Sequence, residues 1–294
     1  MPLVQHRFKA MGGPCEISLW QSDERSSLPL LQVMEAEVRR LERKFSRFRE
    51  DSLVCRLNRG ELNGIGLDEE TQGLMSFANH CYELSDGLFD LTIGALHRVW
   101  SFSGNQVPEE EAVQAALTKV GWPKLAWDGN AVNIRDSVAV DLGGLVKEFA
   151  VDRLVQILRD ASVPGLVNLA GDIAASDVQP EQTPWTVAVC HPREPGAIAK
   201  VELKRGALAT SGDYERYIET DTGRYCHLLR PDTGFPAQNG LCSVSVIAEQ
   251  CIIAGSMSSI AMLKGESGLD WLQKVDLPYL AFDQALNASG TIKV

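Results

Sequence analysis

The chain has 294 residues, of which 45% are hydrophobic, so it can bury a large core as one big domain or two small ones. Its formal net charge is −11 and no run of lysines or arginines stands out, which argues against a nucleic-acid partner because neutralising phosphates needs clustered positive charge. An acidic protein that binds a phosphorylated ligand needs local positive charge, backbone amides or a metal ion instead.

The N-terminal segment MPLVQHRFKAMGGPCEISLW lacks the basic head, apolar run and cleavage site of an export signal. No apolar stretch elsewhere approaches membrane-spanning length. We therefore expect no membrane span and a cytoplasmic location, or a periplasmic one if a signal has been removed. The seven cysteines include no Cys-x-x-Cys pair, which argues against a disulfide framework or a zinc site. Most should be buried thiols in a reducing compartment; Cys226 could be reactive, although core packing is the favoured role.

The first part of the chain, about 28–120, is predicted to be rich in helices. A strand over 16–20 precedes an amphipathic helix, in which one face carries Leu31, Met34, Val38, Leu41 and Phe45. A second helix is expected over about 69–84, with Asp68 as its N-cap. A third is expected to open with Pro108 in its first position and glutamates in its first turn.

The second part, about 125–294, is predicted to be rich in short strands. Strands are expected over 131–134, 138–140, 166–169, 185–189, 200–203, 225–229, 243–247 and 278–282. Helices at about 145–161 and 252–264 interrupt them. Mixed order with hairpin-length connections predicts an α+β fold with a largely antiparallel sheet.

A 26-residue, hairpin-like segment over 211–236 concentrates polar and aromatic side chains. It contains Ser211, Asp213, Tyr214, His227 and a Pro-x-Thr-Gly turn at 231–234. A purely structural hairpin does not need so many polar groups. The segment therefore predicts a pocket for a large polar aromatic ligand.

Two strand-to-turn segments offer groups that could bind phosphate or hydroxyl oxygens. Gly143-Gly144 lets the backbone approach a ligand at a helix start, where unpaired N–H groups bind anions, and Lys147 lies one turn further on. Such a turn is structural about as often as it is functional. Asp172 follows a buried strand; it could cap a turn, bind a ribityl or ribose hydroxyl, or sit in the outer shell of a metal.

A third segment, 87–100, carries Asp90, Thr92 and Trp100. Asp90 and Thr92 lie on the same side if this segment is extended. Trp100 could stack on a flat ring, although a buried core tryptophan is the more common fate.

Together these segments resemble the ApbE-type FAD:protein FMN transferases. These Mg²⁺-dependent enzymes split FAD and attach its FMN half, through the phosphate, to a threonine or serine of a target flavoprotein. The matches follow the family's order along nearly the whole chain: Met11-Gly12, Ser46-Arg47-Phe48 with Ser52 and Asn58, Gly87-x-Phe89-Asp90-x-Thr92, Asp141-Leu142-Gly143-Gly144 with Lys147, Asn168-x-x-Gly171-Asp172, Thr210-Ser211-Gly212-Asp213-Tyr214, His227, and Pro231-x-Thr233-Gly234-x-Pro236. The resemblance implies one domain over 1–294, related to the T-fold, with a largely antiparallel sheet, packed helices and helical embellishment.

The resemblance also implies roles for individual residues. The backbone of Gly143-Gly144 and the side chain of Lys147 would face the pyrophosphate, and the Gly144 carbonyl and the Ser259 hydroxyl would bind the metal. Lys147, His227 and Arg230 are the catalytic candidates. Further candidates to contact FAD are Met11, Asp90, Trp100, Asp172, Ser211, Asp213, Tyr214, His227 and Thr233. The implied partners are FAD and an acceptor flavoprotein.

At the implied metal site the sequence departs from the family. The family has Ala-Asp-Ala-Leu-Ala-Thr, whose aspartate and threonine bind the cation from one helical face. Here the run is 254–259, with Gly255 in place of the aspartate and Ser259 in place of the threonine. Arg230 replaces the aspartate before the Pro-x-Thr-Gly turn; it could pair with the pyrophosphate or simply with Asp232.

Three functions remain open at this point: an active flavin transferase, a non-catalytic FAD-binding protein of the same fold, or an FAD pyrophosphatase. Loss of the only direct carboxylate should weaken Mg²⁺ binding. If position 255 limits activity, Gly255→Asp should raise Mg²⁺-dependent turnover of FAD. If Arg230 substitutes for the metal, Arg230→Ala should weaken metal-free FAD binding.

Overall fold

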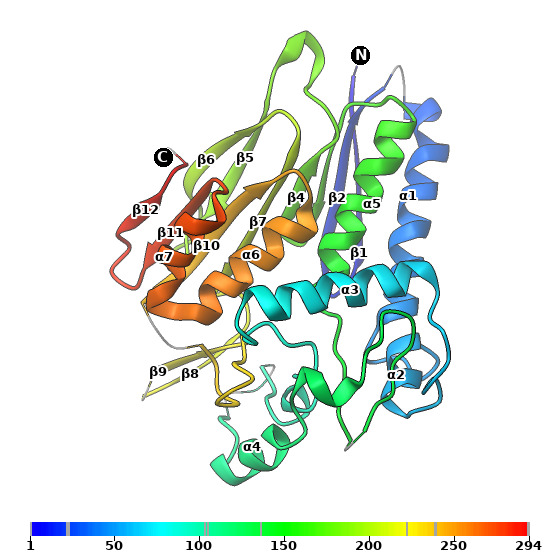
Figure 1. Cartoon of the computed structure of the whole chain (residues 1–294). Coiled ribbons are helices and arrows are strands. Elements are labelled where there is room, and N and C mark those ends of the chain that lie inside the picture. Colours follow the sequence, from blue (N-terminus) through cyan, green and yellow to red (C-terminus); the bar gives the residue numbers. More distant parts are fainter. Residues whose placement is uncertain are drawn as a thin grey trace.

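A computed structural model describes residues 2–21, 24–102, 104, 106–135, 137–221, 223–237 and 240–292. Its centre is an eight-stranded sheet in the order β1-β2-β3-β4-β7-β10-β11-β12, and every neighbouring pair is antiparallel (Figure 1). The prediction of a mixed α+β fold with a largely antiparallel sheet is confirmed. The strands are β1 (Leu3–Ala10), β2 (Gly13–Trp20), β3 (Gly165–Leu169), β4 (Asp172–Ala175), β7 (Gly206–Gly212), β10 (Leu241–Ala248), β11 (Tyr279–Asp283) and β12 (Ala288–Gly290).

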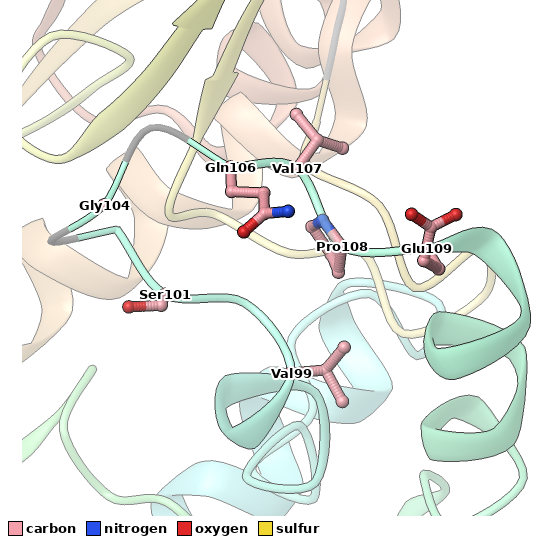
Figure 2. Close-up of a pocket in the computed structure, with 7 residues that line it drawn as sticks. All are labelled: Val99, Ser101, Gly104, Gln106, Val107, Pro108 and Glu109. Carbon is pink, nitrogen blue, oxygen red and sulfur yellow. The ribbon is translucent and has the colours of Figure 1, made fainter.

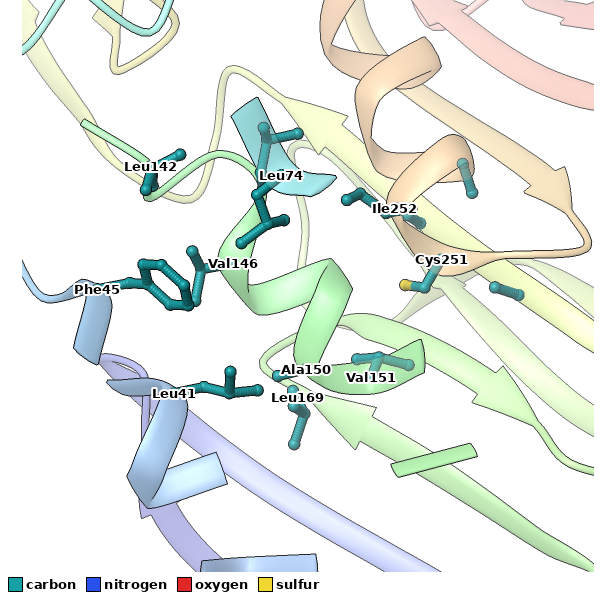
Figure 3. Packing of buried hydrophobic residues seen from close by; sticks show 14 of the residues in the cluster. Leu41, Phe45, Leu74, Leu142, Val146, Ala150, Val151, Leu169, Cys251 and Ile252 are labelled. Carbon is teal, nitrogen blue, oxygen red and sulfur yellow. The ribbon is translucent and has the colours of Figure 1, made fainter. Parts of the chain in front are cut away.

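Three helices cover one face of this sheet: α1 (Glu24–Phe45), α5 (Val146–Asp160) and α6 (Cys251–Lys264) (Figure 1). The predicted apolar face of α1 is buried in this layer, because Leu31, Met34, Val38, Leu41 and Phe45 all belong to the main core. Figure 3 shows α5 between α1 and α6, with Leu74 of α3 (Glu69–Leu84) packing beside Val146. The start of α5 is thus held on several sides by apolar contacts.

The opposite face of the sheet is covered by a hairpin of β5 (Trp185–Cys190) and β6 (Ala197–Leu203). Alternation along the strands separates the two faces. On β7, Ala207 and Ala209 face the helices, while Leu208 faces the hairpin. Both faces of this part of the sheet are therefore buried.

A smaller third core lies at one end of the sheet. It joins η1 (Leu96–Arg98), α4 (Glu110–Leu117) and the hairpin of β8 (Tyr217–Thr220) and β9 (Gly223–Cys226). The remaining elements are α2 (Leu53–Asn58), α7 (Gly268–Val275), η2 (Trp122–Leu125), η3 (Pro180–Gln182) and η4 (Gly265–Ser267). In the described part of the chain, no helix has both the length and the apolar character needed to cross a bilayer.

Several predicted elements need correction. The runs 131–134 and 138–140 are not strands; each forms a single bridge, through Ala131 and Ala139. Their apolar side chains are buried apart from the half-buried Ile134, but asparagine side chains take the place of a neighbouring strand. Asn58 bonds both the N–H and the carbonyl of Val140, at 2.7 and 2.9 Å, and Asn63 does the same for Ile134, at 2.9 and 3.2 Å.

Element boundaries differ elsewhere as well. Helix α4 begins at Glu110 with Glu109 as its N-cap, so Pro108 precedes the helix instead of opening it. Strand β9 ends at Cys226, short of the predicted 225–229. The N-cap role of Asp68 is confirmed, because its side chain accepts a hydrogen bond from the Thr71 N–H.

Candidate functional site

Two tight turns lie side by side at one end of the sheet. Met11-Gly12 joins β1 to β2 with φ of 53° and 77°, and Ala170-Gly171 joins β3 to β4 with φ of 51° and 97°. Positive φ at both central positions suits the right-handed twist of two-residue hairpins. The Ala170 N–H donates to the Pro14 carbonyl at 2.9 Å, which ties the two turns together.

The start of α5 presents open backbone. The Gly143 N–H donates to Asp141 Oδ1 at 2.8 Å, which fixes the turn before the helix. Gly143 and Gly144 are exposed, and a Cβ on Gly144 would meet no atom within 4 Å. No side chain caps the helix at Leu145. A helix N-terminus with accessible glycine backbone is suited to binding a phosphate.

Lys147 and Asp172 form a largely buried ion pair beside this turn, with Nζ 2.6 Å from Oδ2. Asp172 is the first residue of β4 and is 3% exposed, whereas the Lys147 side chain keeps 28% exposure. Burial lowers the pKa of Lys147, but the carboxylates of Asp172 and Glu148 outweigh it, so the pKa lies above its usual value. Lys147 is therefore a permanent cation at the edge of the glycine turn.

Glu148, the next residue, points into the protein toward Gly255 of α6. A Cβ on Gly255 would lie 2.6 Å from Cγ and 3.0 Å from Oε1 of Glu148, so the missing side chain is what makes room for the glutamate. Glu148 is 7% exposed, and its Oε2 has no hydrogen-bond partner among the described residues. Burial, followed by the charge of Asp172, raises the pKa of Glu148 to about 8.

Three serine hydroxyls meet on the same part of α6. Ser211 Oγ, at the end of β7, lies 2.8 Å from Ser258 Oγ and 2.9 Å from Ser259 Oγ. Ser258 Oγ also donates to the Gly255 carbonyl at 2.9 Å. Because Ser259 lies one helical turn beyond Gly255, its hydroxyl shares a helix face with the space that Glu148 fills.

A second charged cluster lies on the other side of the glycine turn. Asp141 Oδ2 is 2.6 Å from His97 Nδ1 and accepts a hydrogen bond from Arg47 at 2.7 Å. Burial alone would raise the pKa of Asp141, but His97, Arg47 and the Gly143 N–H lower it to about 2. Asp141 is therefore ionised and orients the turn.

His227 is a neutral imidazole in this region. Its Nδ1 is buried without a partner among the described residues, and Phe102 contacts the ring edge-on. Burial, and then the positive charge of Arg216, lower the pKa of His227 to about 4. The positive charges of His97 and Lys147 also lower the pKa of His227.

Other predicted site residues are engaged in structural contacts. Asp213 binds Arg193 through both oxygens, at 2.6 and 2.8 Å, and accepts a third hydrogen bond from Gln284. Arg230 pairs with Asp232 and donates to the carbonyl of Leu263 at the end of α6, 2.7 Å away. The geometry thus matches the simpler alternative for Arg230, a pair with Asp232.

The aromatic candidates also lie inside packed regions. Trp100 is 2% exposed, stacks on Phe102, and donates from Nε1 to the Gly234 carbonyl at 2.9 Å. This position is that of a core tryptophan. The Tyr214 ring covers Gly212 so closely that a Cβ there would collide with it, and burial raises the pKa of Tyr214 to about 12.

The segment around Asp90 is a turn and not an extended strand. Asp90 Oδ1 accepts from both the N–H and the hydroxyl of Thr92, at 2.7 Å each, and Oδ2 accepts from the Trp122 N–H at 2.9 Å. The two bonds from Thr92 close the turn, and the bond from Trp122 holds it against η2. Thr233 is exposed, and its hydroxyl accepts from the Phe235 N–H at 3.2 Å.

Two cavities flank the site without including its ion pair. One, of about 420 Å³, adjoins the Met11 turn and is lined by Lys9, Ala10, Gly12, Gly13, Pro14 and Glu42; the Met11 N–H donates to Glu42. The other, of about 290 Å³, lies beside the Trp100 segment, where Val107, Pro108 and Glu109 form part of its wall (Figure 2).

Across the described residues, no group of three or more His, Cys, Asp or Glu side chains is arranged to hold a metal ion by itself. A divalent cation at this site would need oxygens from a ligand as well. Sequence reasoning missed Glu148, His97 and Ser258. For Glu148 a signal existed, since it lies three and seven residues before the buried Val151 and Val155, on the apolar face of α5; a lone histidine such as His97 carries no such signal.

The fold and the open helix start beside a lysine define a protein suited to a phosphorylated ligand. The model of the ApbE family matches residues 11–281, and the chain belongs to this family. The FAD:protein FMN transferase of Haemophilus influenzae is 28% identical over 250 residues, which cover 80% of this chain and 72% of that protein. The crystal structure of the ApbE protein of Thermotoga maritima is similar with a TM-score of 0.89 at 32% identity, covering 99% of this chain and 97% of that one. The apo form of the flavinyl transferase ApbE of Pseudomonas stutzeri gives a TM-score of 0.87 at 27% identity, covering 99% and 95%.

Proposed function

We propose that this chain transfers FMN from FAD to a threonine or serine hydroxyl of an acceptor flavoprotein and releases AMP. Membership of the ApbE family and the names of its relatives support the reaction. The observation that carries it in this chain is the exposed Gly143-Gly144 backbone at the start of α5, beside the Lys147 ammonium. Amides and a fixed cation are what a pyrophosphate needs in an otherwise acidic protein.

The reaction is a displacement at the FMN phosphorus. The acceptor oxygen forms the new phosphorus–oxygen bond, and the bond from that phosphorus to the bridging oxygen breaks, so AMP leaves with that oxygen. Negative charge builds up on the phosphoryl and leaving oxygens, and positioned donors and cations lower the barrier. In this role we place Lys147 and the amides of Gly143 and Gly144.

The hydroxyl proton needs an acceptor. We assign this role to His227, which is neutral and has a buried ring nitrogen without a partner among the described residues. One of the positive charges that lower its pKa belongs to Lys147, which we expect to face the FAD phosphates. Binding of those phosphates should therefore raise the pKa of His227 toward a value more useful for a base.

We propose that the reaction uses Mg²⁺ bound together with FAD. The residues offer suitable oxygens in the Gly144 carbonyl and the hydroxyls of Ser259 and Ser211, next to a buried carboxylate oxygen that has no partner in the described chain. When bound, the ion would neutralise charge on the pyrophosphate. Among the predicted FAD contacts we retain Met11, Asp172 and Ser211, and we assign structural roles to Asp90, Trp100, Asp213, Tyr214, Arg230 and Thr233.

The test uses a model acceptor with a family-type target threonine, incubated with this protein, FAD and Mg²⁺. We expect the acceptor to gain one FMN, seen as intact mass, with one AMP released for each. A matched acceptor with the target threonine changed to alanine should gain nothing. AMP and free FMN without a modified acceptor would identify a pyrophosphatase, and bound FAD without AMP would identify a non-catalytic binder; either result contradicts the proposal.

A further inference from the structure

We propose that Glu148 supplies the carboxylate that binds the divalent cation, in place of the acidic side chain that Gly255 lacks. The inference rests on the proposed function, since the cation is taken to arrive with FAD. It assigns to α5 a ligand that the resemblance placed on α6. The site would thus keep one carboxylate ligand, but the residue that supplies it would lie on α5 instead of α6.

Glu148 and a side chain on residue 255 would compete for the same space. Glu148 Cγ and Oε1 lie 2.6 and 3.0 Å from the point where a Cβ of residue 255 would be. A side chain on residue 255 and the present Glu148 side chain therefore exclude each other. The glutamate brings its carboxylate into the volume that an aspartate at 255 would occupy, and Ser259 lies one turn further along the same face of α6.

The three carboxyl groups at the junction of α5 and α6 differ in their partners. Asp172 Oδ2 has no hydrogen bond of regular geometry among the described residues, but the Lys147 ammonium lies 2.6 Å away and balances its charge. Asp152 accepts from the N–H groups of Cys251 and Ile252, at 2.6 and 2.9 Å, and so caps the start of α6. Glu148 Oε2 is buried and has no partner in the described part of the chain. A buried carboxylate oxygen without a partner is costly unless a cation or donor reaches it.

The oxygens around Glu148 are of the kinds that Mg²⁺ binds. Mg²⁺ prefers one or two carboxylates together with substrate phosphates and water. Glu148 would provide the carboxylate. The hydroxyl of Ser211, from β7, lies 2.9 Å from the hydroxyl of Ser259 on α6, and the FAD pyrophosphate would complete the set. The Lys147 ammonium opposes a second cation, so the metal should bind well only when the phosphates are present.

The test is Mn²⁺ binding, followed by the electron paramagnetic resonance signal of the unbound ion, with and without FAD. Wild-type protein should bind Mn²⁺ tightly only with FAD. Glu148→Gln should weaken that binding about tenfold or more. Asp160→Asn removes the same charge from an exposed position on the same helix and should leave the affinity unchanged. The double variant Glu148→Ala/Gly255→Asp, with the carboxylate on α6, should bind Mn²⁺ again.

The inference would be overturned if Glu148→Gln bound Mn²⁺ with the affinity of the wild type. It would also be overturned if the double variant folded and bound FAD but did not bind Mn²⁺. If Glu148→Gln does not fold, the double variant alone decides. Metal-free FAD binding, measured by flavin fluorescence, separates this inference from the proposed function. If the wild type transfers FMN but does not bind Mn²⁺, the proposed function holds and the assignment of Glu148 as the metal ligand is wrong. If the wild type does not bind FAD, both the proposed function and the assignment are wrong.

Discussion

Gly255→Ala should destabilise this protein, although the same change usually stabilises a helix. Gly255 lies inside α6, which runs from Cys251 to Lys264. In an ordinary helix interior, alanine is better than glycine by about 0.5–1 kcal/mol. Here the new methyl group would lie 2.6 Å from Glu148 Cγ, well inside normal carbon–carbon separation.

The expected magnitude follows from two opposing effects. Overpacking a dense core costs about 1–3 kcal/mol, and the helix-propensity gain offsets up to about 1 kcal/mol of it. We therefore expect the free energy of unfolding to fall by about 1 kcal/mol, within a range of roughly 0–2.5 kcal/mol. The single substitution Gly255→Asp adds a second buried carboxylate to the same clash, so the turnover gain expected from the sequence should appear only when Glu148 is also shortened.

The assay is urea denaturation of four variants, each compared with the wild type. Gly73→Ala is the matched control, because Gly73 lies in α3 and a Cβ there meets nothing within 4 Å. We expect that control to gain about 0.5–1 kcal/mol. Glu148→Ala and Glu148→Ala/Gly255→Ala complete the cycle, and without the glutamate the added methyl group should be neutral or stabilising. Gly255→Ala that stabilises as much as Gly73→Ala would show that Glu148 does not fill this space, and the reasoning about the metal ligand would fail with it.

Three further changes test other parts of the site. Arg230→Ala removes the pair with Asp232 and the hydrogen bond to the Leu263 carbonyl, so the free energy of unfolding should fall by about 1–3 kcal/mol. The affinity for FAD without metal should stay the same. Weaker FAD binding would instead give Arg230 a role at the phosphates. The pKa of His227 is about 4 in the folded protein and near 6.5 in the unfolded chain, so between these pH values only the unfolded chain takes up a proton. The free energy of unfolding should therefore fall by about 3 kcal/mol as the pH drops from 6.5 to 4. Urea titrations of His227→Gln should lack this dependence on pH. Asn58→Ala leaves both backbone groups of Val140 unpaired and should cost about 2 kcal/mol or more in thermal or urea unfolding; a cost below about 0.5 kcal/mol would mean that water replaces the asparagine.

Periodicity was a good guide where one element buries one regular face. The face of α1 that includes Met34 and Leu41 follows directly from 3-4 spacing, and the N-cap of α3 at Asp68 follows from local chemistry. The runs 131–134 and 138–140 are just as apolar, yet they are not strands. Their backbone partners are side chains more than seventy residues away, such as Asn58, and no local pattern contains that information.

The site shows the same division. The glycine turn, Lys147 and Asp172 could be found from the sequence because the turns and the helix start are local features, and the structure brings them together. Asp213 looked similar in the sequence, but Arg193, twenty residues before it, turns the carboxylate into a structural pair. In the sequence, Gly255 indicated only the loss of an acidic metal ligand. The packing of α5 against α6 reveals that Glu148 fills the space of the missing side chain, and no local sequence pattern contains that information.

The most direct test of the account compares FMN transfer by wild-type protein, Glu148→Gln, Gly255→Asp and Glu148→Ala/Gly255→Asp, each with FAD, Mg²⁺ and the threonine acceptor. The intact mass of the acceptor is measured at one fixed time. We predict the addition of one FMN by the wild type and the double variant, and little or none by the two single variants. Equal transfer by wild type and Glu148→Gln would contradict the assigned metal ligand, and no transfer by any of the four would contradict the proposed function.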